Sequence, residues 1–162
     1  MFMARESIPS KMSILGHPIH PMLIHFPVAA LLMLIPADLA YLYTADNFWA
    51  RASLWLVGVG TVGGWVSGAI GFMDLVLVRE IRNLIAAWCH AILAVMLLSI
   101  STLNWLLRIV EPHDEVVSPW GLYLSLLSGF MIALASLLGG LLVYDQAVAV
   151  SPDKMAERRH GS

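Results

Sequence analysis

Residues 22 to 43 read MLIHFPVAALLMLIPADLAYLY, a stretch in which apolar side chains follow one another without alternating with polar ones. About 20 such residues, coiled as a helix, cross the hydrocarbon core of a bilayer, which is ~30 Å thick. Three more stretches of this kind occupy approximately residues 52 to 72, 84 to 107 and 120 to 144. Because a chain in lipid must pair its own backbone polar groups, the sequence predicts an all-α fold, a four-helix transmembrane bundle.

The composition of the whole chain supports a membrane protein and excludes several other classes. Of 162 residues, 59% are hydrophobic and 12% are charged, whereas soluble domains carry about 25% charged residues. The net charge of -2 and the scattered basic residues exclude a nucleic-acid partner. Cys89 is the single cysteine, which excludes an intramolecular disulfide and leaves histidine as the side chain to bind any metal.

The polar residues divide the chain into one membrane domain and two short ends. We expect a polar N-terminal segment over residues 1 to 15, the four-helix membrane domain over residues 16 to 150, and a polar C-terminal tail over residues 151 to 162. Neither end carries a targeting or lipidation signal.

Lysine and arginine side chains gather on one predicted side of the bundle. Arg51 and Arg108 lie on the other side. Cytoplasmic loops of membrane proteins carry the excess of Lys and Arg, so the sequence predicts that both termini are cytoplasmic. The residues that indicate this orientation are Arg5, Lys11, Arg79, Arg82, Lys154, Arg158 and Arg159.

Four of the six histidines lie in or beside the predicted helices. Ionisable side chains are costly to place in a membrane, so their presence there indicates a functional site. His17, His20 and His25 precede or begin the first helix, and His90 follows the start of the third. At 1.5 Å per residue, His25 and His90 lie about 5 Å and about 9 Å along their helices, hence at similar depth. Asp74, at the end of the second helix, lies near the same face.

Prolines control the backbone around these histidines. His17 and His20 each precede a proline, which predicts an extended or turn conformation for both, before the membrane helix begins. Pro27 and Pro36 fall within the first helix and are expected to bend it.

Glycines recur at four-residue spacing on the second predicted helix, at Gly60, Gly64 and Gly68. A stripe of small residues lets membrane helices approach closely. The alternative interpretation is that Gly64 and Gly68 leave room for a flat cofactor such as a porphyrin.

Several motifs together resemble a bacterial membrane family catalogued as domain of unknown function 2231. They are GHPIHPMLIHFPVA from residue 16, GFMD from residue 71, His90, and GGLLVYDQAVAV ending at residue 150. The resemblance covers residues 16 to 150 and implies a multi-pass protein of the bacterial cytoplasmic (inner) membrane. It also implies electron transfer, since some relatives are joined to iron-sulfur domains of the Rieske kind. The family pattern carries over to His17, Pro18, His20, Pro21, His25, Pro27, Asp74, His90, Tyr144 and Asp145, whereas Asp145-Gln146 departs from the basic and histidine residues of relatives.

The leading functional hypothesis is a haem b held between His25 and His90. Neutral imidazole is the usual nitrogen ligand of haem iron. Asp74, Ser67 or a free carbonyl near Pro27 would hold the second ring nitrogen of a ligand histidine. His17 and His20 would bind the propionates or line a quinone or proton entry. The protein would then pass single electrons to a redox partner near the cytoplasmic leaflet.

Three alternatives remain open from the sequence. His17, His20, His25 and His90 could bind a transition metal ion, with Asp74 as an oxygen ligand or a partner of one histidine. The chain could instead bind no cofactor and act as a structural or assembly subunit of a larger membrane complex. A proton or solute pathway through His25, Asp74 and His90 is the third. The small-residue faces permit a homo-oligomer, and an electron-transfer or structural subunit is favoured over a free-standing enzyme.

Overall fold

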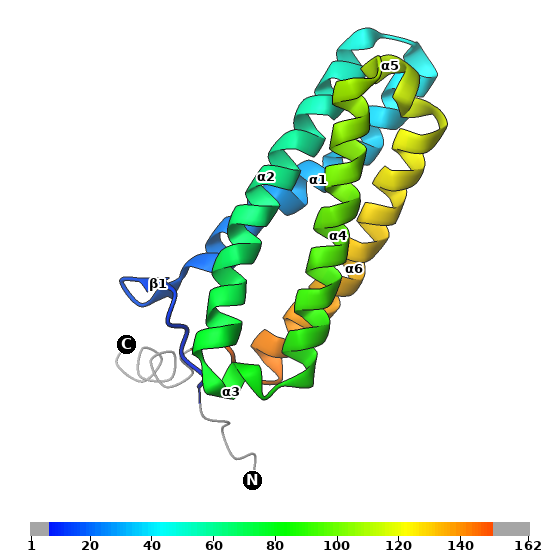
Figure 1. Ribbon diagram of the computed structural model, residues 1–162. Coiled ribbons are helices and arrows are strands. Elements are labelled where there is room, and N and C mark those ends of the chain that lie inside the picture. Colours follow the sequence, from blue (N-terminus) through cyan, green and yellow to red (C-terminus); the bar gives the residue numbers. More distant parts are fainter. Residues whose placement is uncertain (1–6, 151–162) are drawn as a thin grey trace, which may run out of the picture.

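The computed structural model describes residues 7 to 150, which form a bundle of four long helices (Figure 1). These are α1 (Ile19–Thr44), α2 (Asn47–Leu77), α4 (Ile85–Val110) and α6 (Leu122–Tyr144). Four helices, the last extended back to Asp114, are long and apolar enough to cross a membrane. The predicted all-α four-helix bundle is confirmed.

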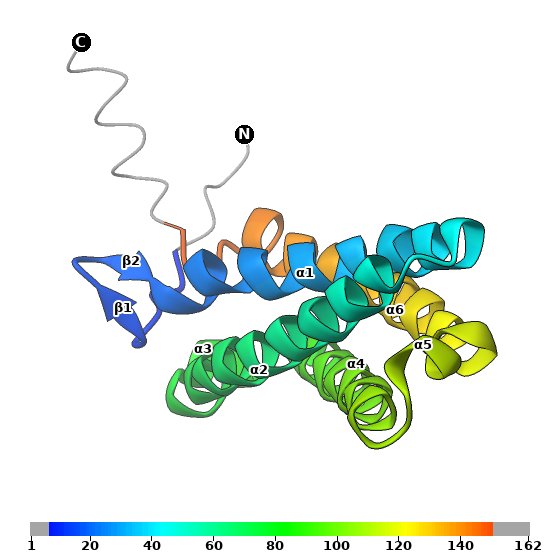
Figure 2. The same ribbon diagram turned by 90° about the horizontal axis from the view of Figure 1, so that it is seen from above.

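Short elements connect the long helices. A hairpin of β1 (Ser13–Ile14) and β2 (His17–Pro18) precedes α1 and projects beyond its first turn (Figure 2). The helix α3 (Arg79–Arg82) joins α2 to α4, and α5 (His113–Val116) with η1 (Val117–Gly121) leads into α6.

Helix α1 begins three residues before the predicted start, so His20 is helical and the extended or turn conformation predicted for it was wrong, whereas His17 lies in the strand β2 as predicted. The residue that directly precedes the helix is Pro18, which is extended with φ −63° and ψ 128°. Pro21 lies in the first turn, where a backbone N–H has no partner within the helix, so its missing hydrogen costs little there. Helix α2 is longer than predicted at both ends, and the Asp46 carboxylate accepts a hydrogen bond from the Phe48 N–H at 2.8 Å to begin it.

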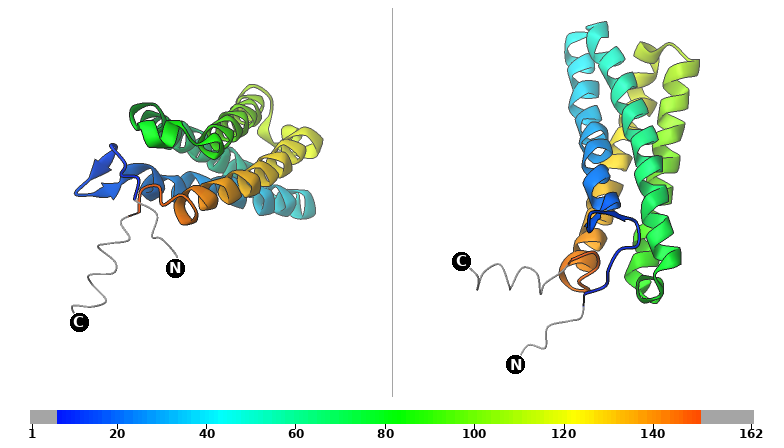
Figure 3. Two further views of the ribbon diagram at one scale, coloured as in Figure 1. Left: turned by 90° about the horizontal axis from the view of Figure 1, so that it is seen from below. Right: turned by 90° about the vertical axis from the view of Figure 1, so that its left-hand side faces the viewer.

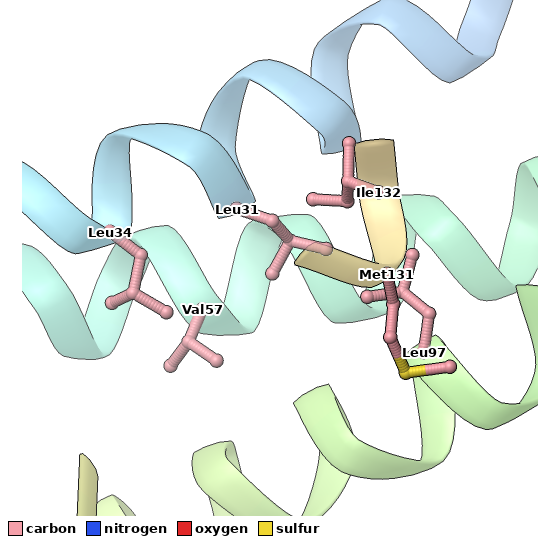
Figure 4. Close-up of a cluster of buried hydrophobic side chains, with 6 residues drawn as sticks. All are labelled: Leu31, Leu34, Val57, Leu97, Met131 and Ile132. Carbon is pink, nitrogen blue, oxygen red and sulfur yellow. The ribbon is translucent and has the colours of Figure 1, made fainter. Parts of the chain in front are cut away.

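Each long helix packs against its neighbours in the chain, and α1 packs against α6 to close the ring. Helices α1 and α4 therefore lie across the bundle from each other. Leucine side chains of α1 and α4 meet apolar side chains of α2 and α6 in the middle (Figure 4). This central apolar cluster consists of Leu31, Leu34, Val57, Leu97, Met131 and Ile132.

The two ends of the described chain lie side by side at one end of the bundle (Figure 3). Ile8 forms a bridge with Val148, its N–H donates to the Ala147 carbonyl at 3.1 Å, and its carbonyl accepts from the Ala149 N–H at 2.8 Å. Both ends therefore lie on one side of the membrane, and their cytoplasmic location stays a prediction. The predicted tail over 151 to 162, the first six residues of the N-terminal segment and the charges on Arg5, Lys154, Arg158 and Arg159 lie outside the described residues.

The glycine stripe of α2 is packed against its neighbours. A Cβ atom added at Gly60 would lie 2.6 Å from Leu31 Cγ and 3.3 Å from the Pro27 carbonyl oxygen. At Gly63 the nearest atom would be Pro27 Cβ at 3.5 Å. The glycines thus let α1 approach α2 closely, at the turn where Pro27 interrupts the helical hydrogen bonds.

Gly60→Ala is expected to lower the free energy of unfolding by about 1 to 3 kcal/mol, because Leu31 is buried and must move to admit the methyl group. Thermal unfolding in detergent would measure the change. Gly140→Ala is the matched control, since its Cβ would meet only Tyr144 Cδ2 at 3.9 Å. Equal stability of the two variants would contradict the close α1–α2 packing.

Candidate functional site

His20 and His90 face each other across the bundle, near the end where the chain termini lie. His20 is in the first turn of α1 and His90 is near the start of α4. Their ring centroids are 6.5 Å apart and their ring planes are nearly perpendicular, at 81°. Two imidazoles from opposite helices thus meet in the bundle.

Each ring is held by the main chain of a third or fourth helix. His20 Nδ1 lies 2.8 Å from the Ser67 carbonyl oxygen on α2, and His90 Nδ1 lies 2.9 Å from the Ala135 carbonyl oxygen on α6. A carbonyl oxygen only accepts, so both Nδ1 atoms carry the proton. In the neutral rings, both Nε2 atoms are therefore unprotonated and have a lone pair to offer.

Two glycines make room for the rings. A Cβ atom at Gly71 of α2 would lie 2.9 Å from His20 Nδ1, and one at Gly139 of α6 would lie 3.4 Å from His90 Cε1. All four long helices therefore contribute to the histidine pair, two by a ring and two by a carbonyl and a glycine.

The histidine opposite His90 is His20, not His25 as the sequence predicted. Five residues separate His20 from His25, which rotates the two side chains roughly 140° apart around a helix. His25 is exposed and lines a shallow pocket of about 290 Å³ with His17, which is exposed too. The other walls of this pocket are Pro18, Pro21, Met22, Val143, Val148, Ala149 and Val150.

Asp74 supports the N-terminal segment. Its carboxylate accepts hydrogen bonds from the Ser10 hydroxyl at 2.5 Å and from the backbone N–H groups of Lys11 and Met12 at 2.8 and 2.9 Å. The Lys11 ammonium adds a hydrogen bond of 2.8 Å to the Leu77 carbonyl. These bonds fix the segment before the hairpin against the end of α2.

Gly64 and Gly68 contact a neighbouring side chain rather than bordering an open space. A Cβ atom at Gly64 would overlap Leu98 Cδ2, and one at Gly68 would lie 3.4 Å from Leu98 Cδ1. The structure thus pairs these two glycines with α4.

A buried ion pair at the other end of the bundle was missed by the sequence reasoning. The Arg108 guanidinium donates to both carboxylate oxygens of Asp38, at 2.8 Å each, and its Nε donates to Asn104 Oδ1 at 2.9 Å. The Ser125 hydroxyl lies 2.7 Å from Asp38 Oδ2. Both charged side chains are fully buried. The signal in the sequence was an aspartate inside one apolar run and an arginine four residues after an asparagine in another.

Among the side chains that the structure describes, no group of three or more His, Cys, Asp or Glu is close enough to hold a metal ion. The predicted set of His17, His20, His25 and His90 is divided in this part of the chain. His20 and His90 face each other, while His17 and His25 border the exposed pocket.

The model of one protein family, described as a predicted membrane protein (DUF2231), matches residues 16 to 152. The chain belongs to this family. In this DUF2231 protein, the match begins just before the histidine and proline segment. It ends shortly after Val148, the residue that forms a bridge with Ile8. No curated protein and no solved structure matches the chain.

Asp38→Asn is expected to destabilise the DUF2231 bundle by roughly 3 to 5 kcal/mol, because it leaves the buried Arg108 charge without a counterion. Thermal unfolding in detergent would show the loss. The double variant Asp38→Leu, Arg108→Met removes both charges and should recover most of the stability. Arg51→Gln, at an exposed position, is the control and should unfold as the wild type does. A single variant as stable as that control would contradict the burial of the pair.

Proposed function

We propose that His20 and His90 are the two axial ligands of one haem b, and that the protein carries single electrons at the end of the bundle where its termini lie. The observation that carries this proposal is that Nδ1 of each ring faces a main-chain carbonyl oxygen. Each Nδ1–H donates to a main-chain carbonyl, which leaves each Nε2 able to bind a metal.

The separation of the rings supports a shared ion. Two imidazoles that bind one metal from opposite sides, with metal–nitrogen bonds of about 2 Å, have ring centroids roughly 6 Å apart. The centroids of His20 and His90 are 6.5 Å apart. Perpendicular ring planes place no restriction on such an arrangement, since each nitrogen lone pair lies in the plane of its own ring.

The number of ligands favours haem over a bare ion. A structural zinc ion takes four ligands, usually all from protein. In the described part of the chain, histidine, cysteine and acidic side chains do not assemble into groups of three or more. A porphyrin supplies four nitrogen ligands itself and needs two more from the protein. His20 and His90 are two such ligands.

Haem supplies reversible one-electron chemistry when it is bound. The chain's own contribution is to hold two ligands in one orientation through the Ser67 and Ala135 carbonyls, and hydrogen bonds of this kind tune the potential. We infer that the electrons pass to a redox partner or a quinone on the side where the termini lie, which the charge distribution predicts to be the cytoplasm of a bacterium.

A reduced-minus-oxidised visible spectrum of the purified protein, produced with ample haem, tests this function. The wild type is expected to show a b-type spectrum at one haem per chain. His20→Ala and His90→Ala should each abolish it, because one axial ligand is lost. His25→Ala and His17→Ala are the matched controls and should keep it, since both side chains are exposed away from the pair.

Rescue separates ligand loss from misfolding. The variant His20→Gly, given free imidazole, is expected to regain the spectrum, because the small molecule can take the place of the missing ring. A wild-type protein that folds but takes up no haem would overturn the proposal and favour a structural subunit. A spectrum lost in His25→Ala but kept in His20→Ala would move the site to the exposed pocket.

A further inference from the structure

The hairpin before α1 ends in a turn that exposes two apolar side chains. Leu15 and Gly16 join β1 to β2, and both have positive φ, at 52° and 78°. Two-residue turns of this kind favour Asn-Gly or Asp-Gly, because asparagine and aspartate tolerate positive φ better than leucine does. Leu15 is nevertheless 93% exposed, and Ile14 beside it is 61% exposed. A leucine at this position therefore costs backbone energy and gains almost no burial within the described chain.

The hairpin lies at the side of the bundle, whereas α3 lies at the end of it (Figures 1 and 3). The two ends of the hairpin meet where α1 begins, because the Ile19 N–H donates to the Met12 carbonyl at 3.0 Å. The next residue, His20, packs against Gly71, where an added Cβ atom would lie 2.9 Å from His20 Nδ1. Gly71 lies six residues before the last residue of α2, which is about 9 Å along the helix. The base of the hairpin is therefore nearer to the middle of the bundle than the end of α2 is.

This position coincides with the edge of the hydrocarbon core of a bilayer. Helix α2 has 31 residues, which corresponds to a length of about 46 Å. The hydrocarbon core is ~30 Å thick, so a helix of this length that is centred in the membrane extends roughly 8 Å beyond the core on each side. The base of the hairpin, about 9 Å from the end of α2, then lies at the boundary between the hydrocarbon and the lipid headgroups.

The boundary is also where a hairpin of this kind is stable. A two-stranded sheet has two open edges, and open edges do not occur in the hydrocarbon itself, where backbone groups find no water. At the boundary, water and headgroups satisfy the backbone while apolar side chains reach the acyl chains. Met22 and Phe26 are exposed on one face of the first two turns of α1, a helix long and apolar enough to cross the membrane. The apolar tip of the hairpin thus continues, along the chain, a surface that contacts lipid.

We infer that the β1–β2 hairpin is an interfacial membrane anchor, with the side chains of Ile14 and Leu15 inserted among the acyl chains of the leaflet nearest the chain termini. The partner is the bilayer itself, and the attraction is the burial of apolar surface, which offsets the backbone cost of leucine in this turn. The anchor holds the start of α1, and with it His20, at a fixed depth in the membrane. The inference stands whether or not haem binds to the histidine pair.

Electron paramagnetic resonance of a nitroxide label measures this depth in the full chain, reconstituted in phosphatidylcholine vesicles. The label is attached at Leu15→Cys in a chain that also carries Cys89→Ser, because Cys89 is exposed and would react too. Oxygen concentrates in lipid and a nickel chelate in water. We expect the ratio of oxygen to nickel collisions at residue 15 to be severalfold higher than at Glu80→Cys, an exposed position on α3. A ratio equal to that of Glu80→Cys would overturn the inference. A label shielded from both reagents would indicate a protein contact in place of lipid and would overturn it as well.

A substitution that keeps the turn but removes the apolar side chain gives a second measurement. Leu15→Asn suits the positive φ better than leucine does, so the hairpin should remain folded. With the label at Ile14→Cys, Leu15→Asn is expected to lower the ratio of oxygen to nickel collisions severalfold. Leu15→Met is the matched control and should leave the ratio unchanged, because it keeps an apolar side chain at the tip. An unchanged ratio in Leu15→Asn would show that the leucine does not anchor the hairpin.

Discussion

The buried ion pair between Arg108 and Asp38 sets the geometry of one end of the bundle. In the low dielectric of a membrane interior, an isolated charge is far more costly than a paired one. Asp38 lies on α1, Arg108 and Asn104 on α4, and Ser125 on α6, so that pairing these groups brings three helices into one register. Gly121 admits the guanidinium, because a Cβ atom there would lie 2.7 Å from one of its nitrogens. Once this end is fixed, the lengths of α1 and α4 determine which residues meet at the other end.

At the opposite end of the bundle, buried neutral polar groups must also have partners. His20 and His90 could not lie in an apolar interior with both ring nitrogens unsatisfied. Main-chain carbonyls of Ser67 and Ala135 satisfy one nitrogen on each ring, although such carbonyls are usually already engaged within their own helices. A helix can offer a carbonyl a second hydrogen bond because the oxygen has two lone pairs. The remaining ring nitrogens, the two Nε2 atoms, are not satisfied by these carbonyls. A ligand that binds them would therefore stabilise the pair.

The sequence predicted the number of helices because a run of about twenty apolar residues has few stable structures other than a membrane-spanning helix. Counting residues along each helix placed His90 and the histidine segment at the same end. The prediction chose His25 rather than His20 because it started the first helix at Met22. In the structure α1 starts at Ile19, since the first turn needs no N–H group, and this outweighs the rule that a residue before proline avoids the helical region. The prediction missed Arg108 because charge at the end of an apolar run is usually exposed to water. That arginine can be buried because the Asp38 carboxylate lies opposite it across the bundle and pairs with it.

Two polar layers separated by an apolar cluster make a bundle whose ends are energetically independent. Along α1, His20 and Asp38 lie about 27 Å apart at 1.5 Å per residue. Substitutions at sites farther apart than 7 to 10 Å and without shared partners usually have additive effects on stability. The apolar side chains of Leu31, Leu97 and Ile132 fill the middle and provide no polar group through which a change of charge at one end could be relayed to the other. The ion pair can therefore hold the helices in register without its charge being felt at the histidine pair, and the chemistry of that pair depends on its own ring nitrogens and on the carbonyls that orient them.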